Sequence, residues 1–149
     1  MNDYVLGHYA RQSLFFDKAL KKPGVILDLV IFNGDVLMAG HVPSETLKAL
    51  AIQRIRQLDH YRRLFIQVAV ANMPSHALED SWITTKINTQ MLSDSSIDLH
   101  LFKIATVDNI VYILGDAKAA EAHHVIRIAS QTDGVKRVVT LMKEYVLKQ

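Results

Sequence analysis

Cysteine is absent from this sequence of 149 residues. Its absence excludes disulfide bonds, thiolate metal sites, a cysteine nucleophile and the acylated cysteine of a lipobox. No segment approaches the roughly 20 apolar residues of a membrane-spanning helix. The N-terminal residues also lack the basic segment followed by an apolar run that marks a signal peptide. We therefore expect a soluble chain that carries neither a signal peptide nor an acyl anchor.

Charge is sparse and evenly spread. The formal net charge is +2, and nine of the 17 lysine and arginine residues precede Glu79. A nucleic-acid-binding protein more often shows a concentrated basic patch, and this sequence has no basic tail or dense cationic run. We therefore predict no nucleic-acid partner. Half of the residues are hydrophobic, which supplies a real but modest core to each of two modules of about 70 residues.

Motifs that carry chemistry are also missing. Neither the G-x-S-x-G pattern of hydrolases nor a phosphate-binding P-loop pattern occurs. His123 and His124 are adjacent, and neighbours on a helix point about 100° apart, so these two side chains do not converge on one metal ion. We predict no catalytic residue, no metal site and no cofactor, and we expect a binding protein rather than an enzyme.

An internal repeat is the main feature of the sequence. Residues 33–40 resemble residues 108–115, since each segment is a turn followed by a short apolar strand that ends in glycine. Three further matches keep the same order along the chain: residues 62–65 with 136–139, Asp3 with Asp80, and Asp17 with Asp94.

The offset between the two copies changes only within loops. It is 77 residues at the first helix, 75 at the turn and strand, and 74 before the last strand. Insertions that fall between elements kept in register indicate a duplicated domain. We predict a first domain at residues 1–72, a linker at residues 73–78 and a second domain at residues 79–149.

Each copy predicts the element order αββαβ. The first copy predicts a helix over residues 3–16 and strands at residues 25–32 and 35–39, joined by a turn at Asn33-Gly34. Ser44 caps a second helix. The apolar positions of the two helices and the last strand follow in order: Leu6, Ala10, Leu14; Leu47, Ala51, Ile55, Leu58; Leu64, Ile66, Val68, Val70. The predicted fold class is α+β, with two αββαβ domains, each a three-stranded mixed sheet with two helices on one face.

The second copy predicts the same elements with some local differences. Asp80 is predicted to cap the first helix, because its carboxylate can accept from the N–H groups of the first turn. The turn Asp108-Asn109 lacks glycine, so we expect a different or longer turn there. The last strand is predicted at residues 135–141. The buried helix positions are predicted at Ile83, Ile87, Met91, Ala119, Ala122, Ile126 and Ala129.

Two further expectations concern surfaces. The pairs Arg62-Arg63 and Lys136-Arg137 are predicted to be solvated strand starts. In the first strand, Leu27, Leu29 and Ile31 occupy one face, while Ile26, Val30 and Phe32 occupy the other. Large exposed apolar patches are uncommon, so the second face is expected to meet either the other domain or a partner chain in a homodimer.

Some segments resemble a known family. The αββαβ order, the turn-strand-glycine segments and residues 133–139 resemble a BON domain (bacterial OsmY and nodulation). Residues 80–87 and 128–139 resemble the second domain of the dual-BON outer-membrane lipoprotein family (DolP/YraP). The resemblance covers nearly the whole chain and is more specific in the second half.

The resemblance implies a periplasmic protein, associated with the inner leaflet of the outer membrane, that helps to keep this membrane intact. It also implies that the first helix of the second domain recognises anionic phospholipid. The family's signal peptide and acylated cysteine are absent here, so either the sequence is trimmed to its soluble part or the protein has no anchor.

The first helix of the second copy offers a candidate lipid-binding face. Trp82 lies about 100° around the helix from the inward-facing Ile83, and Lys86 and Thr89 follow Trp82 at i+4 and i+7. Tryptophan favours the headgroup level of a membrane, and lysine can extend its ammonium group to lipid phosphate. We therefore predict four lipid-binding residues: Trp82, Thr85, Lys86 and Thr89.

These observations leave two functions open. One is a non-catalytic module that binds an anionic phospholipid surface, and the other is a protein-interaction scaffold of the cell envelope without direct lipid binding. An exposed Trp82 favours lipid, whereas an exposed face at Ile26, Val30 and Phe32 favours a protein partner.

Overall fold

A computed structural model describes residues 1–142 of the chain. It divides into two compact units, Met1–Ser75 and His76–Gln149. Each unit has two helices and one three-stranded sheet, so the predicted α+β class and the predicted αββαβ order are both confirmed.

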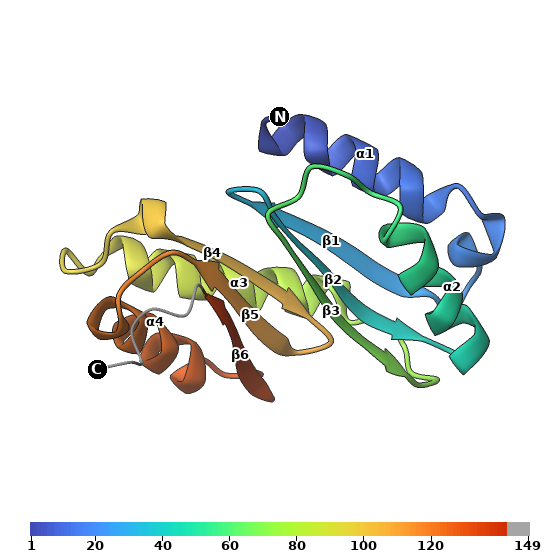
Figure 1. Ribbon diagram of the computed structural model, residues 1–149. Helices are drawn as coiled ribbons and strands as arrows, with labels where there is room; N and C mark the ends of the chain where they lie inside the picture. The colour runs from blue at the N-terminus through green and yellow to red at the C-terminus, as the bar shows by residue number, and fades with distance from the viewer. Residues whose placement is uncertain (143–149) are drawn as a thin grey trace. The chain divides into compact units, whose positions relative to one another are not determined.

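The elements of the first unit follow the predicted order (Figure 1). They are α1 (Asp3–Phe15), the short 3-10 helix η1 (Lys18–Lys21), β1 (Ile26–Phe32), β2 (Asp35–Val42), α2 (Glu45–Ile55) and β3 (Arg63–Val70). Strand β2 pairs antiparallel with β1 and parallel with β3, which makes the sheet mixed. The Ser44 hydroxyl accepts from the Leu47 N–H at 3.2 Å, so the predicted cap of α2 is confirmed.

The second unit repeats this order (Figure 1). Its elements are α3 (Ala77–Leu92), η2 (Leu99–Leu101), β4 (Phe102–Val107), β5 (Ile110–Gly115), α4 (Ala119–Gln131) and β6 (Arg137–Met142). Strand β5 pairs antiparallel with β4 and parallel with β6.

In each unit the core lies between the two helices and one face of the sheet. The buried side chains of the first core are Leu6, Ala10, Leu14, Leu20, Leu27, Val36, Met38, Val42, Ala51, Ile55, Leu58 and Val68. In the second unit Ile83, Ile87 and Met91 are buried as predicted, but on α4 Val125 is fully buried where Ile126 was expected. Val70 was also expected in the core; it is exposed, because β3 ends there.

The opposite face of β1 carries Ile26, Val30 and Phe32. Val30 is buried and the other two side chains are half-buried. Which surface covers this face stays a prediction.

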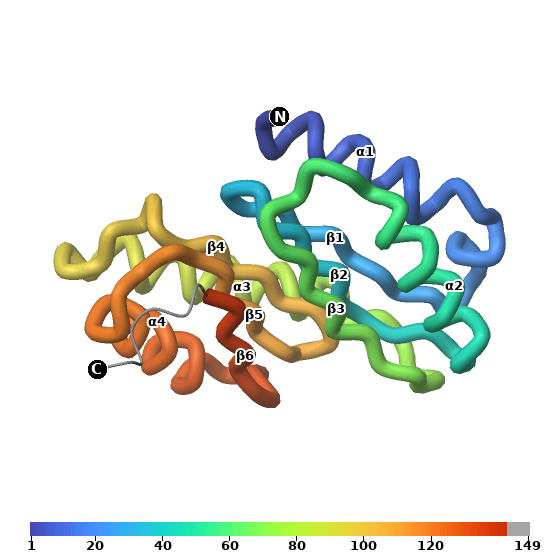
Figure 2. The backbone as a smooth tube through the Cα atoms, viewed as in Figure 1, coloured from blue at the N-terminus to red at the C-terminus, as the bar shows by residue number. Residues whose placement is uncertain are grey.

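In each unit a hairpin joins the first two strands, β1 with β2 and β4 with β5 (Figure 2). The two turns have similar backbone conformations, although only the first contains glycine. Asn33 and Gly34 have φ values of 49° and 84°, and Asp108 and Asn109 have φ values of 56° and 62°. Strand pairing closes directly around each two-residue turn. The prediction of a different or longer second turn is therefore wrong. Aspartate and asparagine tolerate the left-handed conformation better than other non-glycine residues, so this turn forms without glycine.

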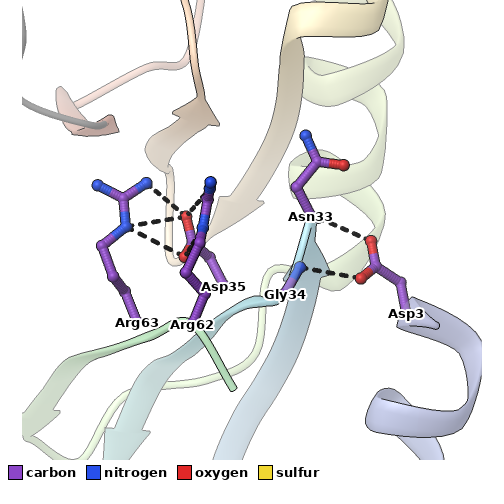
Figure 3. A network of polar contacts seen from close by, with 6 residues as sticks. All are labelled: Asp3, Asn33, Gly34, Asp35, Arg62 and Arg63. Carbon is purple, nitrogen blue, oxygen red and sulfur yellow. Dashed lines mark hydrogen bonds and ion pairs between the residues drawn. The ribbon is translucent and has the colours of Figure 1, made fainter. Parts of the chain in front are cut away.

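An aspartate at the start of the first helix holds each turn. In the first unit the Asp3 carboxylate accepts from the Asn33 N–H at 2.7 Å and from the Gly34 N–H at 2.9 Å (Figure 3). In the second unit Asp80 accepts from the Asp108 N–H at 2.9 Å and from the Asn109 N–H at 2.8 Å.

Asp80 is therefore not the cap of its helix. Helix α3 begins at Ala77, and His76 occupies the cap position without a side-chain hydrogen bond. The predicted capping role of Asp80 is wrong, because its carboxylate turns toward the neighbouring hairpin instead of back to its own helix.

The two arginines before and at the start of β3 share one buried partner. The carboxylate of Asp35, which is fully buried, accepts from the guanidinium groups of both Arg62 and Arg63 (Figure 3). Arg62 is nevertheless exposed, as predicted, whereas Arg63 is half-buried. The prediction of a solvated strand start is therefore wrong for Arg63, because the parallel pairing of β2 with β3 places it beside Asp35. Lys136 and Arg137 are exposed, as predicted.

Candidate lipid-binding surface

Helix α3 separates its buried and exposed residues cleanly. Ile83, Ile87 and Met91 are spaced by four residues, and this spacing keeps them on the side that faces the core of the second unit. Their burial fixes the rotation of the helix. Residues on the opposite side are therefore held outward.

Three large apolar side chains stand on the outward side of α3. Leu78 is 89% exposed, Trp82 62% and Leu92 71%. Thr85 and Thr89 are exposed between them. Successive steps of four, three, four and three residues keep all five side chains within about 80° of the helix circumference. We call Leu78, Trp82, Thr85, Thr89 and Leu92 the α3 stripe.

The α3 stripe carries no charged side chain, although large apolar residues seldom gather on an exposed helix face of a soluble protein. The sequence-based prediction placed Trp82, Thr85 and Thr89 here, and the structure brings these three together on one surface. The sequence-based prediction did not include Leu78 and Leu92. Leu78 had been assigned to the linker, because the helix was expected to begin at Asp80. The signal was available in the spacing, since both leucines are in phase with Trp82.

Lys86, the fourth predicted residue, lies at the edge of the α3 stripe and is half-buried. Its ammonium group donates to the carbonyl oxygen of Asp133 at 3.4 Å. A lysine ammonium has three donors, so one long bond to a backbone oxygen leaves donors for a phosphate. The Thr85 hydroxyl donates to the Ser81 carbonyl at 3.0 Å, within the helix.

Asp80 lies on the buried side of the same helix. Burial raises the pKa of its carboxyl above the ordinary value of 3.8, against the two turn N–H groups that lower it. Asp108 adds to the rise as a neighbouring negative charge. The Asp80 carboxyl therefore contacts the turn and does not reach the α3 stripe. The α3 stripe is uncharged, and Lys86 lies at its edge.

A family model identifies the second unit. The model for the BON domain matches residues 79–144. The second unit is a BON domain. The α3 stripe is thus the outward face of the first helix of this BON domain, and the first unit repeats its αββαβ order.

Curated relatives extend the similarity beyond the BON domain. The chain is 26% identical over 145 residues to outer membrane lipoprotein DolP of Haemophilus influenzae, covering 96% of this chain and 75% of that protein. It is 28% identical over 148 residues to a 21 kDa hemolysin of Actinobacillus pleuropneumoniae, covering 95% and 74%. The chain therefore carries a BON domain in its second unit and is similar to DolP over nearly its whole length.

Among the solved structures that align with this chain, the similarity in sequence and structure is low for the following example. It is the C-terminal domain of CdsD, the structural protein of the type III secretion system of Chlamydia trachomatis. The alignment covers 95% of this chain and 98% of the solved chain, with a TM-score of 0.36 and 11% identity.

The two adjacent histidines and the question of a membrane-spanning helix concern parts of the chain outside the α3 stripe. His123 and His124 are exposed neighbours on α4, and no group of three possible metal ligands occurs among residues 1–142. Within the same residues, no helix is both long enough and apolar enough to cross a membrane.

Proposed function

We propose that this protein is a non-catalytic module that binds anionic phospholipid at the periplasmic side of the outer membrane and contributes to the integrity of that membrane. The proposal rests on one observation above all: the BON domain presents Leu78, Trp82 and Leu92 to solvent on a single helix face. The similarity to an outer membrane lipoprotein supports the location.

The α3 stripe suits a membrane interface. Tryptophan prefers the headgroup level, and the two leucines extend the apolar contact to both ends of the helix. A helix that lies in the interface gains affinity from buried apolar area and from cations that meet anionic lipid. Lys86 supplies one such cation, which is worth about 1 kcal/mol near an anionic surface.

The exposure of Trp82 also bears on the alternative. A scaffold that bound a protein through the face of β1 opposite the helices would expose Ile26, Val30 and Phe32. Val30 is buried, however, and the other two side chains are half-buried. Trp82, by contrast, is mostly exposed. The contrast favours the lipid surface.

Tryptophan fluorescence tests the proposal directly, since Trp82 is the only tryptophan. We expect a blue shift when the protein is titrated with vesicles of phosphatidylcholine and phosphatidylglycerol, and no shift with phosphatidylcholine alone. Lys86→Glu should weaken binding. Leu78→Ser and Leu92→Ser should each weaken it about tenfold, as expected from burial of roughly half a leucine or more.

Leu99→Ser is a matched control, because Leu99 is exposed in the same domain but lies outside the α3 stripe. It should leave vesicle binding unchanged. If Trp82 stays quenchable by acrylamide at high lipid concentration and shows no shift, the lipid function is wrong and the scaffold becomes the better explanation.

A further inference from the structure

The connection between α1 and β1 in the first unit forms an exposed corner with an unusual composition. Phe16 is 78% exposed, and Lys18, Lys21 and Lys22 are exposed next to it in the chain. We call Phe16, Lys18, Lys21 and Lys22 the basic corner. An exposed phenylalanine without a polar handle beside three lysines is not explained by the core of this unit.

The short 3-10 helix η1 orients the lysines. Side chains three residues apart eclipse one another in a 3-10 helix, so Lys18 and Lys21 point to the same side. Leu20, between them, is buried in the core and anchors the other side of η1. The three lysines lie within five consecutive residues, so their proximity is a local property of the sequence, and η1 sets the direction of their side chains.

Asp17, the acidic residue within this segment, already has hydrogen-bonding and ionic partners. The Asp17 carboxylate accepts from the Ala19 N–H at 3.0 Å and pairs with Arg54 at 3.4 Å. Arg54 in turn lies over the Phe16 ring, 5.7 Å from its centroid. Among residues 1–142, no ion pair involves the three lysines. The corner therefore keeps a surplus of positive charge.

The corresponding corner of the second unit has the opposite character. It runs from Ser93 to His100, contains Asp94 and Asp98, and has no lysine. The positive charge and the exposed aromatic ring are therefore properties of the first unit and do not follow from the shared fold.

We propose that the basic corner is a second, separate contact surface for an anionic membrane. Lysine side chains lay their methylene stems along an apolar surface and extend their ammonium groups to phosphate, while an apolar ring enters the boundary between headgroups and acyl chains. Single-stranded nucleic acid would instead stack its bases on the ring, but Arg54 occupies one ring face. Phe16 and the surplus charge together fit a lipid surface. The inference goes beyond the proposed function, since it does not involve the α3 stripe.

The first experiment removes the charge. The full chain with Lys18→Gln, Lys21→Gln and Lys22→Gln is compared with the parent chain by sedimentation with phosphatidylcholine–phosphatidylglycerol vesicles. Each lysine near an anionic surface contributes about fivefold in affinity, so the triple variant should bind about a hundredfold more weakly. A triple change of Lys103→Gln, Lys118→Gln and Arg127→Gln removes the same charge from exposed positions elsewhere, and it should weaken binding much less.

Equal losses in the two triple variants would mean that only net charge matters, and this result would overturn the basic corner. No loss in the lysine variant would overturn it as well. If that variant keeps its vesicle binding but loses binding to a single-stranded oligonucleotide, the membrane assignment is wrong and the corner serves a different polyanion. Circular dichroism shows whether each variant is folded.

The second experiment separates the two surfaces. In the double variant Phe16→Trp and Trp82→Phe, the introduced indole reports on the basic corner alone, while the parent chain reports on the α3 stripe. We expect the introduced indole to shift to the blue and to be shielded from acrylamide only with anionic vesicles. No shift there, together with a shift of Trp82 in the parent chain, overturns the basic corner and leaves the proposed function standing. The reverse pattern supports the corner and contradicts the α3 stripe.

Discussion

The two units use the same aspartate clamp for their hairpin turns but anchor their last strands differently. Asp3 and Asp80 each accept from both N–H groups of a two-residue turn. At the first residue of the second strand, however, the first unit has the buried Asp35 with its two arginines, and the second unit has Ile110 beside the exposed Arg137. The comparison teaches that the turn clamp is tied to the fold, whereas the ionic anchor of the last strand is an addition of one unit.

The outward faces of the first helices differ as well. At the offset of 77 residues, the α3 stripe corresponds to Met1, which precedes α1, and to Val5, His8, Gln12 and Phe15 on α1. Val5 and Phe15 are half-buried, and His8 and Gln12 are polar and exposed. These four positions of α1 therefore do not form a row of exposed apolar side chains. The cores of the two units are alike, whereas the outward faces of their first helices differ.

The largest expected effect tests a close contact that both units share. A Cβ atom added to Gly40 would lie 1.8 Å from the Ile26 carbonyl oxygen, and one added to Gly115 would lie 2.4 Å from the Leu101 carbonyl oxygen. Gly40 also has a φ of 139°. We expect Gly40→Ala to destabilise the first unit by more than about 4 kcal/mol and Gly115→Ala to destabilise the second by about 3 kcal/mol.

Amide hydrogen exchange measured by mass spectrometry assigns each loss to its unit. Gly24→Ala is the control, because an added Cβ there comes no closer than 3.8 Å to Pro43 and only the positive φ of 91° opposes it. It should cost about 1 kcal/mol. If the amide protons of both units exchange equally slowly in all three variants, the strands can move apart without loss of stability, and the expected effect is wrong.

A smaller effect tests the ionic anchor. Asp35→Asn removes the charge that pairs with Arg62 and Arg63 within a buried site, and we expect a loss of about 3 kcal/mol from the free energy of unfolding of the first unit. In the second unit, Arg137 is the counterpart of Arg63, and Arg137→Gln should cost less than about 0.5 kcal/mol, because Arg137 is exposed. Urea unfolding followed by hydrogen exchange measures both values. Similar losses in the two units would contradict the difference drawn between their anchors.

The smallest expected effect is an opposite response to acid. Burial would raise the pKa of Asp35, but hydrogen bonds and charges from Arg63 and Arg62 hold it below its ordinary value of 3.8. The stability that Asp35 contributes is present above the unfolded pKa and is lost as pH falls through the folded pKa. Burial raises the pKa of Asp80, so its contribution is present below the unfolded pKa and is lost as pH rises through the folded pKa.

Acidification through the region around 3.8 should therefore weaken the first unit relative to the second. Hydrogen exchange at a series of pH values measures this for each unit. Asp35→Asn should remove this contribution to the pH dependence of the first unit, and Asp80→Asn should do so for the second. A parallel response of both units in the parent chain would show that neither carboxyl controls the acid response.

Local patterns in the sequence determined the duplication, the element order, the Ser44 cap and the turn at Asn33-Gly34, because each depends on neighbours within a few residues. They also predicted one helix face with Trp82, Thr85, Lys86 and Thr89, since the positions of Ile83 and Ile87 set the rotation of the helix. In the structure Lys86 lies half-buried at the edge of this face. Helical periodicity is a property of the chain itself, so this part of the candidate surface needed no tertiary information.

The tertiary structure decided the rest. Asp80 serves a turn 28 residues away in the chain, and Asp35 meets Arg62 27 residues away. Nothing in local spacing indicates such partners. Local periodicity determines which side of a helix or strand faces the core. The partner of each buried charge lies far away in the chain, so it is determined only when the elements pack together.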